Sequence, residues 1–270
     1  MTTDFWNSVA NLYDKSPMTH LANDEEMNYI FKVIDSNFIT KIICLGAADG
    51  CRDPLLLLYY LKNTYKKEPK KLIVNDIAEK MLEKCKDRLK EFNQIDIDYV
   101  CSPINKIHIS YNNFIGIFTV YRADFINEAL KLYKIEQDII GKEFKVFPIF
   151  YIDNKIVVNE TINKCFNIND INEDLFDELK NMRKDNFLAY SIITLDKKFI
   201  SHYYDLEMLN LMLTNVLNKK YEKRIMNISD RKILFEISNT NGDTLITCLN
   251  NVLGNIPYDE QIESLCKIFY

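Results

Sequence analysis

The stretch KIICLGAADGCRDPLLLLYYL, residues 41–61, constrains the fold of this chain more than any other feature. It places two of the six glycines, Gly46 and Gly50, between a short apolar run and a long one. The short run predicts a buried strand. The long run predicts a helix packed on a sheet, with Asp53 as its N-cap and Pro54 at the favoured first position. The order is therefore strand, glycine-bearing turn, helix.

A second unit of the same kind follows directly. KLIVND, residues 71–76, predicts a strand, and residues 77–92 place apolar side chains on one helical face with lysines and acids on the other. Further strand-like or helical segments lie at 114–125, 145–160, 172–184 and 187–196. Alternating strands and helices predict an α/β fold with a mostly parallel sheet.

The C-terminal region departs from this pattern. RKILFEIS, residues 231–238, and TLITCL, residues 244–249, flank the dipeptide Asn241-Gly242. Because Asn-Gly adopts positive φ readily, these segments predict an antiparallel hairpin that closes the sheet.

The chain is expected to form a single domain over residues 1–270, since no internal repeat or Pro/Gly-rich linker divides it. Helices predicted near the N-terminus would form a cap over about residues 1–38. Insertions are expected around 126–145 and 200–225.

Composition narrows the class of protein. The chain of 270 residues is 47% hydrophobic and 27% charged, which is typical of globular domains. No apolar run is long enough to span a bilayer, and the N-terminus has no signal-peptide pattern, so we expect a cytoplasmic protein without membrane contact. The seven cysteines are spaced singly, which predicts buried thiols and no metal site.

The charge balance bears on possible partners. A formal net charge of −5 argues against a protein built to grip phosphate backbone. Residues 62–71 carry five lysines, but they connect a predicted helix to a predicted strand. A solvated loop is the simpler interpretation, with RNA contact as the minor one.

The glycine turn can cradle a ligand, since exposed backbone N–H groups at a helix start form a polar rim. The turn comprises Gly46, Ala47, Ala48, Asp49 and Gly50. Ala48 breaks the glycine fingerprint for dinucleotides, and no Gly-Lys-Ser/Thr follows, which excludes a P-loop. A plain strand-to-helix turn explains the pattern equally well.

The second strand favours a ligand. It ends in Asp76, where a carboxylate can accept hydrogen bonds from both ribose hydroxyls. Ile77 and Met81 would suit the flank of an adenine ring. The alternative role for Asp76 is to cap the next helix. Turn and acid together predict an adenosine-containing ligand.

ICLGAADG and VNDIAEKMLEKCKDRLKE resemble the first motif and the second strand and helix of class I S-adenosylmethionine-dependent methyltransferases. The resemblance implies a Rossmann-like, doubly wound sheet and S-adenosylmethionine as cofactor. Two positions differ from the family pattern: Cys44 stands where an acid is usual, and Ala48 replaces the middle glycine.

A narrower similarity is to the histidine-specific methyltransferase-like group, on the stretches LGAADGCRDPLLLL, YRADF and VVNETINKCF. It implies that Asp124 lies near the adenine amino group and Phe125 beside the ring. It also implies an amino-acid-like acceptor.

Acceptor-side residues are expected beyond the carboxyl ends of later strands, where ligands of open α/β sheets bind. We predict Glu160 and Tyr204 as catalytic residues. Substrate-binding residues are predicted at Thr161, Asn163, Tyr203 and Asp205. Loop or helix capping is the alternative role for these groups. Trp6 and Tyr13 would either pack in the core or close over the cofactor.

The sequence leaves several functions open. The preferred one is N- or O-methyl transfer to a small-molecule or amino-acid-like acceptor. The alternatives are an RNA or protein methyltransferase, aminocarboxypropyl transfer from the same cofactor, and a cofactor-fold protein that binds without reacting. Oligomeric state is not predicted.

Overall fold

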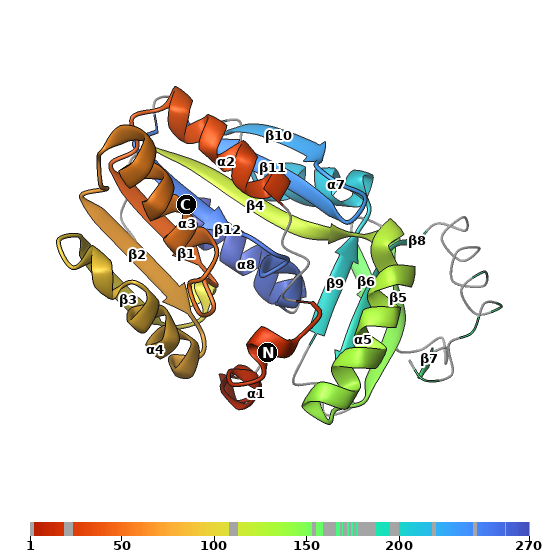
Figure 1. The fold of residues 1–270 in the computed structure, drawn as a ribbon. Coiled ribbons are helices and arrows are strands. Elements are labelled where there is room, and N and C mark those ends of the chain that lie inside the picture. Colours follow the sequence, from red (N-terminus) through yellow and green to blue (C-terminus); the bar gives the residue numbers. More distant parts are fainter. Residues whose placement is uncertain are drawn as a thin grey trace.

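The structure is a computed structural model, and its arrangement is drawn in Figure 1. The residues that it describes are 3–18, 24–107, 113–152, 155–158, 166–167, 169, 172, 174, 177, 187–194, 200–217, 220–239, 242–256 and 258–269.

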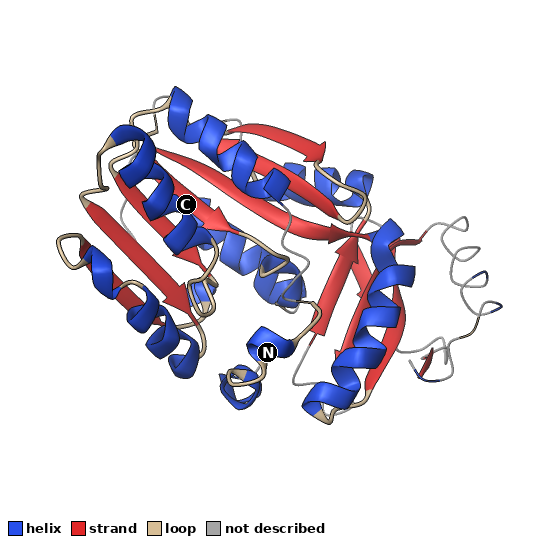
Figure 2. Ribbon diagram, viewed as in Figure 1, coloured by secondary structure: helices blue, strands red, loops and turns tan. Residues whose placement is uncertain are grey.

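Five parallel strands form one half of the sheet, in the order β3-β2-β1-β12-β4 (Figures 1 and 2). Their bounds are β1 (Lys41–Leu45), β2 (Lys71–Asp76), β3 (Asp96–Cys101), β4 (Phe114–Arg122) and β12 (Thr244–Cys248). The order reverses direction at β1, which is the topology that places ligand sites beyond the carboxyl ends of the strands.

Helices cover both faces of this half because alternate residues of each strand point to opposite sides. Ile42 and Cys44 of β1 belong to the core cluster that contains α2 (Asp24–Ser36) and α3 (Asp53–Tyr60). The amphipathic helix α4 (Glu79–Arg88) buries its apolar residues on the same face.

Ile43 and Leu45 of β1 belong to the opposite cluster. That cluster contains apolar residues of α7 (Leu206–Val216) and α8 (Tyr258–Phe269). The prediction of an α/β fold with a mostly parallel sheet and helices on both faces is confirmed.

The antiparallel hairpin near the C-terminus is present, but its partner strands differ from the prediction. β11 (Lys232–Ser238) pairs antiparallel with β10 (Glu222–Asn227) on one side and with β4 on the other. The predicted partner β12 instead lies between β1 and β4, parallel to both. All five residues of β12 are buried, as a central parallel strand requires. The predicted pairing of 231–238 with 244–249 was therefore wrong.

An antiparallel extension continues the sheet beyond β4. β9 (Ile200–Tyr204) pairs in parallel with Tyr121 and Arg122, the last residues of β4, and the antiparallel order β9-β8-β5-β6 follows. The other strands are β5 (Phe144–Ile152), β6 (Lys155–Val158), β7 (Phe166–Asn167) and β8 (Phe187–Thr194). Helix α5 (Ile126–Ile140) packs on this extension through Tyr133, whose ring centroid is 4.8 Å from that of Phe144.

The N-terminal segment lies between the two parts (Figure 1). It consists of α1 (Thr3–Val9) and a 3-10 turn (Tyr13–Lys15). Phe5 and Val9 pack in the cluster that contains α5, whereas Ala10 packs against Ala78 and Met81 beside α4. The segment thus bridges the parallel half and the extension.

Candidate functional site

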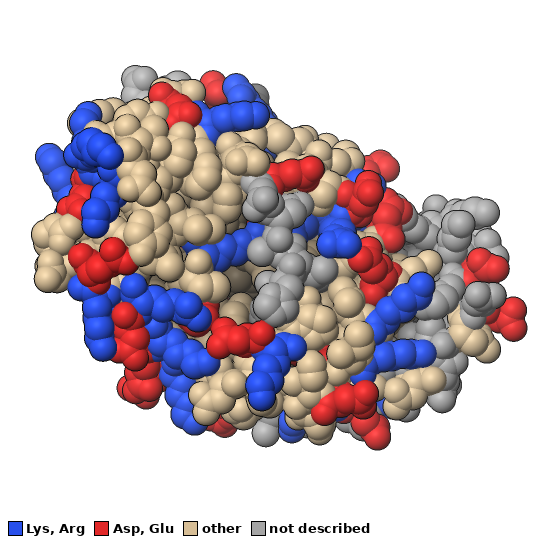
Figure 3. Space-filling model, viewed as in Figure 1, with Lys and Arg blue, Asp and Glu red and all other residues tan. Residues whose placement is uncertain are grey.

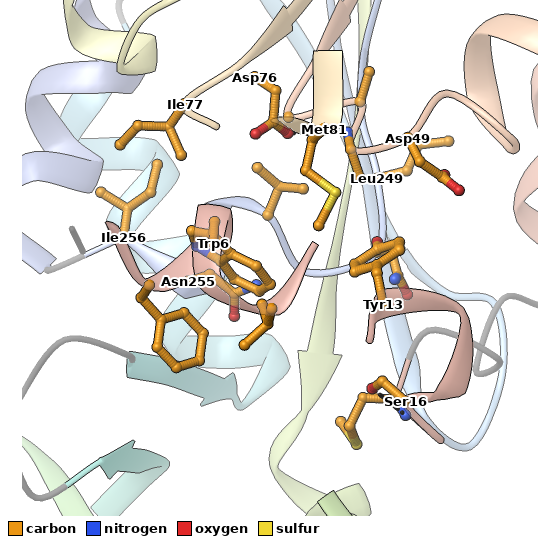
Figure 4. Close-up of a pocket in the computed structure, with 18 of the residues that line it drawn as sticks. Trp6, Tyr13, Ser16, Asp49, Asp76, Ile77, Met81, Leu249, Asn255 and Ile256 are labelled. Carbon is orange, nitrogen blue, oxygen red and sulfur yellow. Dashed lines mark hydrogen bonds between the residues drawn. The ribbon is translucent and has the colours of Figure 1, made fainter. Parts of the chain in front are cut away.

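A cavity of about 260 Å³ lies at the carboxyl ends of the parallel strands, under the N-terminal segment. In Figure 4, Asp76 and Met81 face Trp6 and Tyr13 across it. Segments that are distant in the sequence meet here: residues 5–18, 46–53, 75–81, 102–105 and 249–256, together with parts of α5 and α8.

The glycine turn forms one wall and alternates between ordinary and left-handed backbone. Gly46, Ala48 and Gly50 have φ values of 63°, 50° and 71°. A side chain at Gly46 would overlap Val252, and one at Gly50 would overlap the Cys85 thiol. Ala48 adopts a left-handed conformation that costs an L-residue about 1 to 2 kcal/mol. Glycine at this position would adopt the same backbone without that cost.

Asp76, at the end of β2, ties the turn to the second strand. Its Oδ2 accepts a hydrogen bond from the Ala48 N–H at 2.9 Å, and its Oδ1 accepts one from the Ala78 N–H at 2.8 Å. The N-cap position of α4 is Ala78, so Asp76 is not the cap. A carboxylate has about four acceptor sites, so both oxygens can still accept from a ligand. Burial raises the pKa of Asp76 to about 6.

Two further acids line the same wall. Asp49 is buried, accepts from the Cys51 N–H at 3.2 Å and pairs with Arg88 at 2.7 Å. Asp53 accepts from the Thr247 hydroxyl of β12 at 2.9 Å, and burial raises its pKa to about 6.

The predicted N-cap role of Asp53 was wrong. Asp53 is the first residue of α3, and the N-cap position is Arg52. Its carboxylate instead fixes the start of α3 to the central strand. Cys44, where the sequence resemblance led us to expect an acid, is fully buried in the core.

The predicted cofactor residues divide into two groups. Those that line the cavity are Gly46, Ala47, Ala48, Asp49, Asp76, Ile77 and Met81. The described residues Gly50, Asp124 and Phe125 are not among its lining residues. Asp124 is exposed and pairs with Arg122 at 2.7 Å, whereas Phe125 is buried beside Tyr121 and Tyr203. The structure thus places both on the extension side of β4 as packing or surface groups.

The predicted acceptor residues near β9 also have structural partners. The Tyr204 hydroxyl donates to Gln261 at 2.5 Å, and Tyr203 stacks on Tyr121 with ring centroids 5.5 Å apart. Asp205 caps α7 by accepting from the Glu207 N–H at 3.0 Å. Among described residues, none of the three lines the cavity. Glu160, Thr161 and Asn163 lie outside the described residues and stay predictions.

Sequence analysis missed the residues that follow β12. Leu249, Asn250 and Val252 line the cavity, and Asn250 and Asn251 both have positive φ, of 56° and 62°. The Asn251 side chain accepts from the Tyr121 N–H at 2.9 Å and donates to Ser201 at 3.0 Å, which holds this turn. The signal was the Asn250-Asn251 pair shortly after the mostly apolar segment TLITCL.

The wall opposite the glycine turn is made of side chains from the extension. Tyr133, Glu136 and Ile140 lie on one face of α5, and Phe144 follows on β5. Glu136 accepts a hydrogen bond from the Ser16 hydroxyl at 2.5 Å, which joins α5 to the N-terminal segment. Burial raises the pKa of Glu136, and the hydrogen bond from Ser16 opposes this in part.

No family model matches this chain, and no curated protein matches it. Its structure is similar to a solved S-adenosylmethionine-dependent methyltransferase from Clostridium acetobutylicum, at 13% identity and a TM-score of 0.43, covering 87% of this chain and 99% of that one.

Two other similar structures contain S-adenosylhomocysteine (SAH). The DhpI–SAH complex is 8% identical, with a TM-score of 0.41, covering 88% of this chain and 95% of that one. The plantazolicin methyltransferase BpumL, in complex with a triazolic desmethylPZN analog and SAH, is 11% identical, with a TM-score of 0.38, covering 86% and 89%. These values are too low to assign an activity to this chain.

Among the described residues, no helix combines the length and the apolar character needed to cross a membrane.

Proposed function

We propose that the chain is an S-adenosylmethionine-dependent methyltransferase that acts on a small-molecule or amino-acid-like acceptor. The observation that carries this proposal is the pair formed by the glycine turn and Asp76. The Ala48 N–H binds Asp76 directly, and both residues line the cavity.

The residues present fit the cofactor. Asp76 would accept hydrogen bonds from the ribose hydroxyls, and Ile77 and Met81 would pack on the adenine ring. Gly46 to Ala48 would bring backbone close to the rest of the ligand. When bound, S-adenosylmethionine supplies an electrophilic methyl group on a sulfonium.

The chain's own contribution to methyl transfer would be positioning and exclusion of water. Phe5, Val9 and Trp6 form an apolar cover, and Tyr133 and Phe144 close the opposite wall. A cavity of about 260 Å³ with apolar walls suits a small acceptor.

Surface charge also favours a small acceptor over nucleic acid. On the face shown in Figure 3, lysines and arginines alternate with aspartates and glutamates. Of the five lysines in residues 62–71, Lys62 lies in a helical turn 3.9 Å from Glu91, and Lys71 begins β2 and pairs with Asp96 and Asp98. Because RNA affinity comes largely from neutralising phosphates with Lys and Arg, and the formal net charge of the chain is −5, we expect weak, salt-sensitive RNA binding at most.

The test has two stages. Thermal melting is measured with S-adenosylmethionine, SAH, NAD or ATP, since a ligand that binds only the native state raises its stability. We expect a rise with the first two compounds. A rise with NAD or ATP alone would contradict the cofactor assignment.

The second stage follows the methyl label into pooled amines and amino acids, and in parallel into RNA and protein. Label in a small molecule supports the proposal. Label in RNA or protein alone would overturn the acceptor class.

A further inference from the structure

The cavity wall opposite the glycine turn combines one carboxylate with aromatic and apolar surface. Glu136 lies one helical turn after Tyr133 on α5, and the Tyr133 ring packs edge-on against Phe144. Phe5, Val9, Met18 and Tyr121 complete the apolar cluster around these rings. A ligand group bound at this wall would contact the Glu136 carboxylate, and the other side chains around it are mostly apolar.

The other cavity acids differ from Glu136 in their partners. Asp49 pairs with Arg88, Asp14 lies 3.9 Å from Lys84 and 3.7 Å from Arg88, and Asp53 and Asp76 are held by hydrogen bonds within the cofactor wall. Glu260 is exposed. Glu136 accepts only a neutral hydroxyl and has no ion pair among the described residues. The Ser16 hydroxyl binds Oε2 of Glu136, so Oε1 of Glu136 can still accept hydrogen bonds from a ligand.

Two basic side chains at or beside the cavity form ion pairs with a different carboxylate. Arg52 lines the cavity, and Lys232 contacts the lining residue Asn250. Arg52 and Lys232 both bind Glu26, which is fully buried, with Lys232 Nζ 2.9 Å from Glu26 Oε1. Arg52 is the only basic side chain among the described residues that line the cavity, so the wall at Glu136 contributes a carboxylate and no cation to the lining. A partly buried carboxylate flanked by aromatic rings favours a cationic ligand through both ion pairing and cation–π attraction.

We propose that Glu136 is the acceptor-binding residue that selects a cationic amine carrying an apolar or aromatic body. The inference rests on the proposed function, since it names the acceptor class of the same cavity. The ammonium nitrogen binds the Glu136 carboxylate, and the body of the acceptor packs on Tyr133 and Phe144. Before transfer one ammonium proton passes to the Glu136 carboxylate, so that the neutral nitrogen has a lone pair to form the N–C bond as the bond from sulfur to the methyl carbon breaks. Alcohols and carboxylic acids of the same shape are disfavoured because they offer no positive charge.

The test uses three probes of matched shape and different charge: 2-phenylethylamine, 2-phenylethanol and 3-phenylpropionate. Each is titrated by calorimetry into full-length protein saturated with SAH. The variant is Glu136→Gln, which keeps the shape and the Ser16 contact. Glu260→Gln is the matched control, because it removes an exposed carboxylate at another part of the same cavity.

We expect the wild-type protein to bind the amine at least about tenfold more tightly than the alcohol or the acid. Glu136→Gln should lose this preference while binding SAH as the wild type does, and Glu260→Gln should keep it. Equal binding of the three probes to the wild type would overturn the inference, as would an unchanged amine preference in Glu136→Gln. A Glu136→Gln protein that loses SAH binding or folding would overturn it as well, because Glu136 would then serve the fold or the cofactor wall.

Failure of the proposed function is distinguishable, since it appears as absence of SAH binding to the wild type before any probe is added.

Discussion

The two halves of the sheet contribute to the cavity in different ways. The parallel half supplies a backbone wall, in which residues 46, 48 and 50 have left-handed backbone and the Asp76 carboxylate accepts hydrogen bonds from the Ala48 and Ala78 N–H groups. The antiparallel extension supplies a side-chain wall, made of Tyr133, Glu136 and Phe144. A backbone wall tolerates few substitutions, whereas a side-chain wall can change its specificity without a change of fold.

The largest expected effect is on the free energy of unfolding, and it is found by replacing one glycine from each half. Gly50 and Gly141 both have positive φ, but a side chain at Gly50 would overlap Cys85, whereas one at Gly141 would meet nothing within 4 Å. Gly50→Ala should lower the free energy of unfolding by about 2 to 4 kcal/mol, from backbone strain and overpacking. Gly141→Ala should lower it by about 1 kcal/mol, from strain alone. Urea denaturation measures both, and equal losses would contradict the close packing of the turn on α4.

Asp76 gives the next largest effect. Asp76→Ala should weaken SAH binding by about 1.5 to 3 kcal/mol, because hydrogen bonds to a charged acceptor lie in that range. The matched control is Asp124→Asn, which should leave the affinity unchanged because Asp124 pairs with Arg122 outside the cavity lining. Calorimetric titration distinguishes the two. A large loss in Asp124→Asn would restore the adenine-binding role that the family resemblance implies.

The cofactor wall should also respond to pH. Burial raises the pKa values of Asp76 and Asp53 to about 6 in the folded chain, above their unfolded values. The folded state then binds more protons than the unfolded state between about pH 4 and 6, so the stability contributed by these two groups falls as pH rises through that range.

SAH affinity should change in the opposite sense, because the ionised carboxylate of Asp76 is the better acceptor. We expect about a tenfold weaker affinity at pH 5 than at pH 7. Asp76→Asn should reduce this dependence, and an unchanged pH profile in that variant would assign the titration to another group.

Tyr204 gives the smallest effect and tests its predicted catalytic role. Tyr204→Phe removes the hydrogen bond to buried Gln261 and should lower stability by about 0.5 to 1.5 kcal/mol. Methyl transfer should stay within about twofold of wild type, since packing around the ring is preserved. A loss of two orders of magnitude in kcat at unchanged stability would return Tyr204 to the active site.

The sequence predicted the backbone wall because its determinants are local. The turn from Gly46 to Gly50 and the acid at the end of β2 each lie within one strand-to-helix unit. The place of β12 could not be predicted in this way. Its apolar run fits both a hairpin partner and a central parallel strand, and the choice depends on β1 and β4, far away in the sequence.

The side-chain wall was missed for a related reason. Tyr133 and Glu136 belong to a helix whose amphipathic pattern predicts only that one face is buried. What that face meets depends on how α1 and the extension pack around it. The predicted cluster from Tyr203 to Asp205 shows the converse difficulty: polar and aromatic residues at a strand end fit a binding site from sequence alone, whereas the structure gives these residues packing and helix-capping partners.

The central claim is that the cavity beyond β1, β2 and β12 binds the cofactor. Hydrogen-exchange mass spectrometry with and without SAH tests it most directly, because bound ligand slows exchange where it contacts backbone. We predict protection in peptides that cover residues 46–53, 75–81 and 249–256, with no change across β10 and β11. Absence of protection in these three segments, or protection confined to β10 and β11, would contradict the account.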